Sequence, residues 1–198
     1  MEQFTPAVRE RMQQALDAVE ARPRDPQANG RWGMVLHAHG QHQAAAVAYQ
    51  RAHLLDTGKF DWLYFLGVVQ AADGSYDQAA ATLRRALRKR PDYVPAQLKL
   101  AECLLSAGKP GEAATVYAMV LEQQPSSAEA HYGLGRVHAA RREWDAAVTS
   151  FRKACEMFPS YGAAHYALAL AYRNQGNQDQ AQAVFSNLPT GRPESGST

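Results

Sequence analysis

The chain has 198 residues, of which 46% are apolar and 20% charged, and its formal net charge at pH 7 is +2. These proportions are those of an ordinary soluble protein, and they argue against a disordered chain or a strongly basic nucleic-acid-binding protein. No stretch approaches the ~18 consecutive apolar residues of a membrane helix, and the first ten residues lack a signal-peptide core. We therefore expect a cytoplasmic protein with no membrane segment, and we do not expect nucleic acid as its partner.

The first predicted element is a helix over residues 6–21. Thr5 and Pro6 are typical of a helix start, because proline fits the first turn of a helix. Ala15, Ala18 and Pro23 match the second half of the repeat described next. Residues 1–25 are therefore predicted to form an N-terminal capping helix.

From residue 26 onward, one pattern of residue types returns every 34 residues. A period of this length is typical of a solenoid built from helix-turn-helix repeats. The predicted repeats are 26–59, 60–93, 94–127, 128–161 and 162–195. Their eighth position is always Gly or Ala, and their twentieth is always Ala: Gly33, Gly67, Ala101, Gly135 and Ala169, then Ala45, Ala79, Ala113, Ala147 and Ala181.

Each repeat is predicted to contain two amphipathic helices that cross closely. Positions 4, 7 and 11 of the repeat, and again positions 20, 24 and 27, would share one helix face. Small residues allow two helix backbones to approach, so positions 8 and 20 are expected at the crossing point. The closing prolines Pro91, Pro125, Pro159 and Pro193 are expected to end the second helix.

Turn and cap signals fall at constant places in the repeat. Glycine stands near position 15 in four repeats, where a helix end needs a left-handed residue, whereas the fourth repeat has Arg142 and is expected to be strained there. Ser126 with Glu129 is predicted to form a capping box.

This pattern of Leu, Gly/Ala, Tyr-like, Ala, aromatic and Pro positions resembles the tetratricopeptide repeat family over residues 26 to 195. The resemblance implies an all-α fold, namely a right-handed α-α superhelix of five repeats with the N-terminal capping helix. Thr57 departs from the pattern because it replaces a closing proline. Polar residues also stand at position 4, where the family favours Trp, and they are expected to weaken the fold locally: Asn29, Gln97, His131 and His165.

The resemblance also implies a function, because the first helices of such repeats line a concave groove that binds a peptide or a partner helix. The candidate binding residues are Met34, His37, Tyr64, Tyr93, Leu98, Glu102, Tyr132, Arg136, Tyr161, Tyr166, Arg173 and Asn174. Tyrosine and arginine are typical of binding surfaces, and Arg136 with Arg173 would suit a carboxylate or phosphate. The alternative is that tyrosine at position 5 serves ordinary packing.

No catalytic, metal or cofactor site is predicted. His37, His39 and His42 point to different sides of a helix and so do not converge on a metal. Cys103 and Cys155 are interpreted as reduced, packed thiols. The basic run over residues 84–90 is interpreted as a solvated helix end, with an RNA or other anionic contact as the alternative.

Two functions from different classes remain open. The preferred hypothesis is a protein-protein interaction scaffold that takes a protein or peptide ligand in its groove. The alternative is an assembly or regulatory module of a larger multidomain protein that docks through its C-terminal edge. Ala181, Phe185 and Leu188 are expected to need cover at that edge, and residues 189–198 are predicted to be disordered. A homodimer through this edge, or a longer native chain, would provide the cover.

Overall fold

The computed structural model describes residues 5–186, and that part of the chain contains eleven α-helices and no strand. The predicted all-α class is therefore confirmed. In chain order the helices are α1 (Pro6–Ala21), α2 (Pro26–Ala38), α3 (His42–Leu55), α4 (Phe60–Ala72), α5 (Tyr76–Leu87), α6 (Val94–Ser106), α7 (Pro110–Gln123), α8 (Ala128–Ala140), α9 (Trp144–Met157), α10 (Gly162–Gln175) and α11 (Gln178–Ser186).

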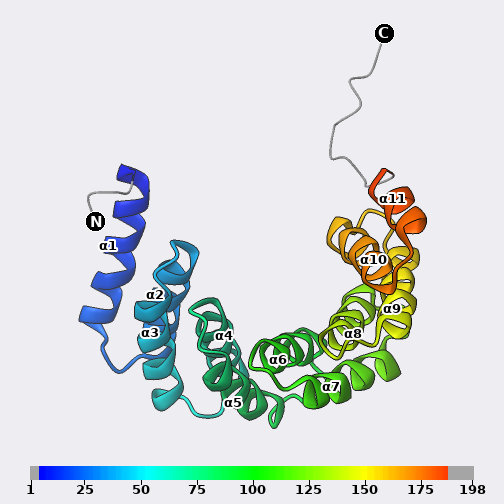
Figure 1. Ribbon diagram of the computed structural model, residues 1–198. Coiled ribbons are helices and arrows are strands. Elements are labelled where there is room, and N and C mark those ends of the chain that lie inside the picture. Colours follow the sequence, from blue (N-terminus) through cyan, green and yellow to red (C-terminus); the bar gives the residue numbers. More distant parts are fainter. Residues whose placement is uncertain (1–4, 187–198) are drawn as a thin grey trace. The chain divides into compact units, whose positions relative to one another are not determined.

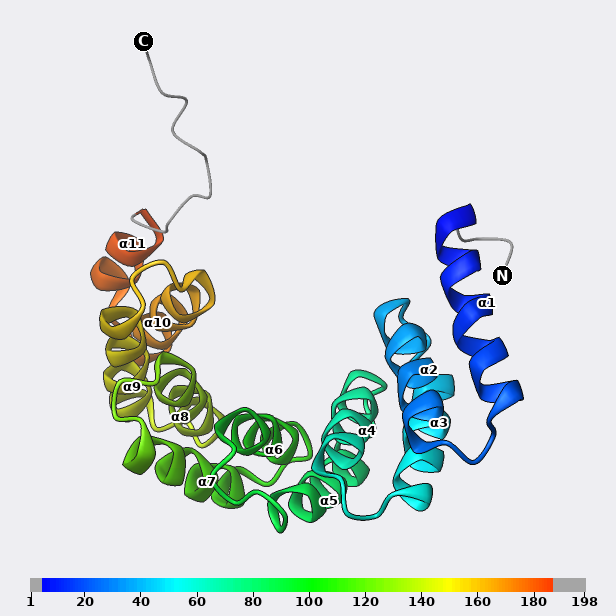
Figure 2. The same cartoon turned by 180° about the vertical axis from the view of Figure 1, so that it is seen from behind.

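The chain divides into two compact units, Met1–Ala107 and Gly108–Thr198, which we call the N-terminal and the C-terminal unit. In the N-terminal unit each helix from α1 to α6 packs against the next one along the chain, and α4 also contacts α6 (Figure 1). In the C-terminal unit the helices from α7 to α11 follow the same rule, and α8 contacts α10 (Figure 2). Helical hairpins that stack in chain order form a solenoid, as predicted. The boundary between the units falls inside the span 94–127 predicted for the third repeat, and the division into five repeats stays a prediction.

Each unit thus has two layers of helices. The first-helix layer consists of α2, α4 and α6 in the N-terminal unit and of α8 and α10 in the C-terminal unit. The second-helix layer contains α3 and α5 in one unit and α7, α9 and α11 in the other. The buried alanines of position 20 lie between the layers, with exposed fractions of 0 to 3%.

The glycines of position 8 make room for the bulky residue of position 24. A Cβ atom built on Gly33 would lie 2.8 Å from Tyr49, and one on Gly67 would lie 2.7 Å from Leu83. A Cβ on Gly135 would overlap the ring of Phe151. The crossing point predicted at positions 8 and 20 therefore includes position 24, whose side chain covers the glycine directly.

The turns within the repeats have the left-handed backbone that the sequence predicts. The φ angles are 70° at Gly40, 80° at Gly74, 74° at Gly108 and 90° at Gly176. Arg142 adopts a φ of 60° at the corresponding place. This conformation brings Cβ close to the following carbonyl oxygen, so the predicted strain at Arg142 is confirmed.

The capping prediction was wrong by one residue. Helix α8 begins at Ala128, and the side chain of Ser127 accepts a hydrogen bond of 3.2 Å from the amide of Ala130. Ser127 directly precedes the helix, as an N-cap must, whereas Ser126 lies one residue further out and is exposed. Sequence spacing alone did not distinguish two adjacent serines.

The polar residues of position 4 make a contact that the sequence analysis did not predict. Each donates a side-chain hydrogen bond to the carbonyl oxygen of a proline six residues earlier, at distances of 2.7 to 3.2 Å: Asn29 to Pro23, Gln97 to Pro91, His131 to Pro125 and His165 to Pro159. In both histidines the Nε2 atom carries the hydrogen, since a carbonyl oxygen only accepts. We call this contact the proline latch.

The proline latch gives the polar residues of position 4 a hydrogen-bond partner that the expectation of a locally weakened fold did not include. The second repeat supports this reading, because it lacks both partners of the latch. Thr57 replaces the proline before it, and the buried Leu63 occupies position 4. The polar side chain at position 4 is therefore present in the repeats that have a proline six residues earlier. It is absent in the repeat that lacks this proline.

Candidate functional site

In the N-terminal unit, the predicted groove residues are positioned by the first-helix layer. Met34 and His37 lie on α2, Tyr64 lies on α4, and Leu98 and Glu102 lie on α6, with Tyr93 at the N-cap of that helix. Met34 is 47% exposed, whereas His37, Tyr64, Tyr93 and Leu98 are half-buried. The sequence therefore placed these residues on the correct helices, but only part of the set is open to a ligand.

A continuous series of aromatic rings connects three of these residues, His37, Tyr64 and Tyr93. The ring centroids of His37 and Tyr49 lie 6.4 Å apart, and those of Tyr49 and Phe65 lie 5.5 Å apart. Tyr64 continues the series at 5.5 Å from Phe65 and 5.4 Å from Tyr93. Sequence reasoning did not include Tyr49 and Phe65 in the site, although Tyr49 occupies the bulky position 24 and Phe65 directly follows Tyr64.

Burial favours the neutral form of three of these rings, those of Tyr49, Tyr64 and His37. Desolvation raises the pKa of Tyr49 to about 12. It also raises the pKa of Tyr64, as does the neighbouring Tyr93, while Lys99 acts in the opposite direction. Burial, followed by repulsion from His42, lowers the pKa of His37. Tyr49, Tyr64 and His37 are therefore uncharged at neutral pH.

Two cations lie against aromatic faces at the same end of the first-helix layer. The guanidinium of Arg90 lies 5.0 Å from the ring centroid of Phe60 and 5.7 Å from that of Tyr93. Lys59 lies 4.7 Å from the ring of Trp62. Glu102 is less available than the sequence suggests, because Lys99 binds its carboxylate at 2.6 Å.

In the C-terminal unit, the candidate residues form a smaller aromatic cluster. The ring centroids of Tyr132 and Tyr161 are 5.1 Å apart, and Arg136 lies 5.9 Å from the ring of Tyr132. Tyr132 also contacts the buried Phe151 at 5.7 Å, so part of its role is structural. Tyr166 on α10 is 53% exposed and contacts Phe185 of α11 at 5.8 Å.

Arg173 and Asn174 lie near the end of α10 and are both exposed. The amide of Asn174 donates 2.9 Å to the carbonyl of Leu170 on its own helix. Asn174 also lines an open hollow of about 460 Å³ between the α8–α9 turn and the end of α10. In that hollow Gln175 donates 2.5 Å to the carboxylate of Asp145. Asn174 therefore lies at the edge of the first-helix layer, beside a polar hollow. Two residues that line this hollow, Gln175 and Asp145, already form a hydrogen bond with each other.

Comparison with known proteins identifies the family. One model described as "Tetratricopeptide repeat" matches residues 70–137 and 104–149, and a second with the same description matches residues 132–195. The chain belongs to the tetratricopeptide repeat family. No curated protein matches the sequence.

Solved structures of other tetratricopeptide repeat proteins share the fold. MamA from Desulfovibrio magneticus RS-1 is 19% identical, with a TM-score of 0.76 over 82% of this chain and 92% of that one. YrrB, described as having an unusual peptide-binding site, is 21% identical, with a TM-score of 0.67 over 87% and 89% of the two chains. TTC0263 from Thermus thermophilus is 24% identical, with a TM-score of 0.68 over 86% and 93%. At these identities the likeness concerns the fold alone.

Tetratricopeptide repeat arrays are generally interaction modules rather than catalysts. Both cysteines are buried, and desolvation raises the pKa of each thiol to about 11, which leaves little reactive thiolate at neutral pH. Within residues 5–186, no group of three or more His, Cys, Asp or Glu side chains is arranged to hold a metal ion. No helix in that range is both long enough and apolar enough to span a membrane.

Proposed function

We propose that this tetratricopeptide repeat protein holds an extended peptide or a partner helix against its first-helix layer. Membership of the family supports the general function of a protein-protein interaction scaffold. The groove itself is our proposal, and the observation that carries it is the exposed Tyr166 on α10, the helix that follows α8 with Tyr132 and Arg136 in the same layer. These residues belong to neighbouring helices of the same layer, since α8 contacts α10.

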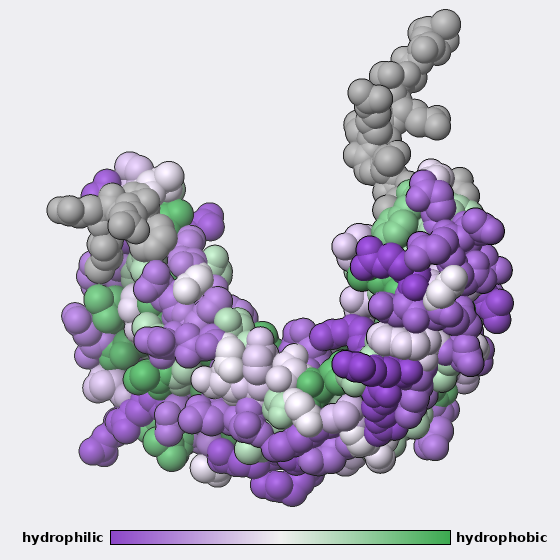
Figure 3. Space-filling model, viewed as in Figure 1, coloured by the Kyte–Doolittle hydropathy of each residue, from purple (hydrophilic) through white to green (hydrophobic). Residues whose placement is uncertain are grey.

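The chemistry of this surface suits recognition of a protein. A tyrosine that is 53% exposed on a folded helix offers a large rigid contact area and a polar tip without ordering a flexible chain. Arg136 is held near the ring of Tyr132, so its guanidinium would reach an acceptor on the ligand with little further loss of freedom. On the face shown in Figure 3, hydrophobic residues reach the surface in small patches between hydrophilic ones, as expected for a surface that also remains hydrated.

The test compares two double variants of the C-terminal unit by affinity capture and quantitative mass spectrometry. The first variant, Arg136→Glu with Tyr166→Ser, alters the proposed surface. The matched control, Lys153→Glu with Met157→Ser, makes equivalent changes at exposed positions of α9 in the second-helix layer. We expect captured proteins to be lost with the first variant and retained with the control. Equal capture by both variants would remove the proposal.

The alternative of docking through the C-terminal edge has less support than the sequence suggested. Ala181 is only 3% exposed, and Phe185 is half-buried against Tyr166, so α10 already covers the apolar side of α11. Leu188 and the predicted disordered segment 189–198 lie outside the described residues. A homodimer, a role within a larger protein and a cytoplasmic location stay predictions.

A further inference from the structure

The second-helix layer of the N-terminal unit carries a strongly basic surface that the proposed groove does not use. Helix α3 contains no acidic residue, and α5 has one, Asp77, in its first turn. The remaining arginine and lysine residues of the two helices and of residues 88–90 have no acidic residue among them. We call the following residues, together with Val47 and Leu54, the basic outer face: Arg51, Arg84, Arg85, Arg88 and Lys89.

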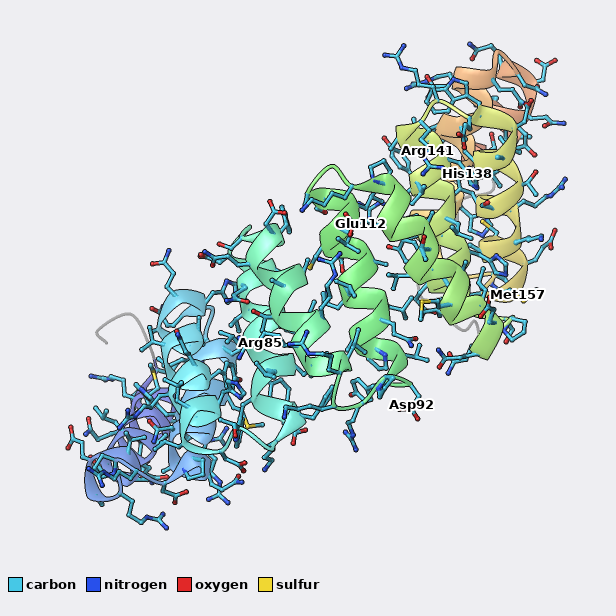
Figure 4. All side chains as sticks on the ribbon, turned by 90° about the horizontal axis from the view of Figure 1, so that it is seen from below. Arg85, Asp92, Glu112, His138, Arg141 and Met157 are labelled. Carbon is cyan, nitrogen blue, oxygen red and sulfur yellow. The ribbon has the colours of Figure 1, made fainter. Side chains whose placement is uncertain are left out.

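A direct contact joins the two helices of this face. Arg85 extends from α5 toward α3 and donates a hydrogen bond of 2.9 Å to Nε2 of His53 (Figure 4). Because guanidinium only donates, His53 is neutral and carries its hydrogen on Nδ1. Burial lowers the pKa of His53, as do Arg85 and Lys89, against a smaller opposite effect of Asp56. The cations of α5 therefore act on α3, and the two helices present one charged surface.

The same face exposes apolar side chains at helical spacing. Val47 is 69% exposed and Leu54 is 64% exposed, more than any other large hydrophobic residue of the described chain. Residues seven apart lie on one side of a helix, and Arg51 falls between them on that side. An exposed apolar stripe flanked by cations is the complement of a helix that has one apolar side and acidic borders.

We propose that the basic outer face docks an acidic amphipathic helix of a partner protein. Charge complementarity favours an acidic ligand, and the Val47–Leu54 stripe favours a helix with an apolar side. Single-stranded nucleic acid fits less well, because its bases stack on exposed aromatic rings. Tyr49 of α3 is fully buried, and the exposed Tyr76 begins α5, at the opposite end from Arg88 and Lys89.

The experiment uses the full chain and a labelled synthetic peptide of about 18 residues, long enough for five helical turns. The peptide consists of Glu and Leu, with Leu repeated at i, i+3, i+4 and i+7. A scrambled peptide of identical composition removes the apolar side but keeps the charge. Fluorescence anisotropy at about 50 mM salt limits the screening of surface charges. We expect the amphipathic peptide to bind and the scrambled peptide to bind at least about tenfold more weakly, which is the loss expected from one unburied leucine side chain.

Variants then test the surface residue by residue. Arg88→Glu with Lys89→Glu should weaken binding by about tenfold or more, since each close charge reversal costs of the order of 1 kcal/mol. Leu54→Ser should weaken it by about tenfold through lost apolar contact. Arg9→Glu with Arg11→Glu, at exposed positions of α1, is the matched charge control and should bind as the wild type does. Arg88→Gln with Lys89→Gln removes the two charges without reversing them, so it tests the same surface if the reversed charges disturb the end of α5. This variant should also weaken peptide binding.

Several results would overturn the proposal. These are no binding of the amphipathic peptide, equal binding of the scrambled peptide, or binding that Leu54→Ser leaves unchanged. Tighter binding of a 16-residue oligouridylate, or of phosphatidylserine vesicles, would assign the face to nucleic acid or to a membrane instead. Arg136→Glu with Tyr166→Ser should leave peptide binding unchanged, so failure of the groove proposal and failure of this one are separate outcomes.

Discussion

Replacement of Gly135 by alanine should destabilise the protein, although alanine is the better helix former. Alanine gains about 1 kcal/mol over glycine inside a helix. At Gly135, however, the new Cβ would lie 2.9 Å from Cγ of Phe151 and would overlap two further atoms of that ring. Phe151 is only 2% exposed, so its ring has no free space to occupy. Overpacking of this kind costs about 1 to 3 kcal/mol, which offsets or exceeds the helix gain.

Gly111→Ala is the matched control, because the new Cβ would meet only Arg141, at an ordinary contact distance of 3.6 Å. We expect Gly135→Ala to be about 1 to 3 kcal/mol less stable than Gly111→Ala in urea unfolding followed by circular dichroism. In thermal unfolding this corresponds to a difference of several degrees, at about 2 to 4 °C per kcal/mol for a chain of this size. Equal stabilities of the two variants would refute the idea that position 8 must remain empty beneath position 24. Adding Phe151→Leu to Gly135→Ala should recover part of the loss that Gly135→Ala causes.

Three further predictions concern the backbone, the histidines with a lowered pKa and the proline latch. Arg142→Gly should raise the unfolding free energy by up to about 1 kcal/mol, because relief of the left-handed backbone strain exceeds the entropy cost of glycine. A lower urea midpoint for this variant than for the wild type would contradict the prediction. His53 and His37 have a lower pKa in the folded state than in the unfolded one, so stability should fall as pH drops below about 6.5, where only the unfolded chain takes up protons. Urea midpoints at pH 7.5 and 5.5 should therefore differ, and less so in His53→Gln. His165→Ala should lower the unfolding free energy by about 0.5 to 1.5 kcal/mol. His165→Gln retains a hydrogen-bond donor, as Gln97 does, and should lower it less. Identical thermal midpoints of the two variants and the wild type would show that the proline latch does not stabilise the fold.

The sequence was a good guide to the elements because the constraints on them are local and repeated. Small residues at position 8 and glycines near position 15 each have one steric explanation, and Gly33, Gly67 and Gly40 agree with it. The proline latch was missed because its acceptor is a backbone carbonyl, whose direction depends on the turn. The signal was nevertheless present, since Thr57 and Leu63 depart from the pattern together.

The candidate site was predictable only as a face. Position numbers placed Tyr64 and Tyr132 on the first helices, but they did not reveal how deeply each ring is covered. Nor did they show that Lys99 engages Glu102, because the ion pair depends on side-chain direction rather than on spacing alone. Exposure, which decides what a partner can reach, is set by side chains of the neighbouring helices, as Phe185 of α11 beside Tyr166 shows.

The proline latch has a consequence for the order in which the chain folds. Donor and acceptor are six residues apart, so the bend between two hairpins can be set before any distant segment arrives. Closing so short a loop costs little chain entropy, and each bend would then orient the next hairpin as it forms. A protein emerging from the ribosome could in this way assemble progressively from its N-terminus, with each latched turn orienting the hairpin that follows it.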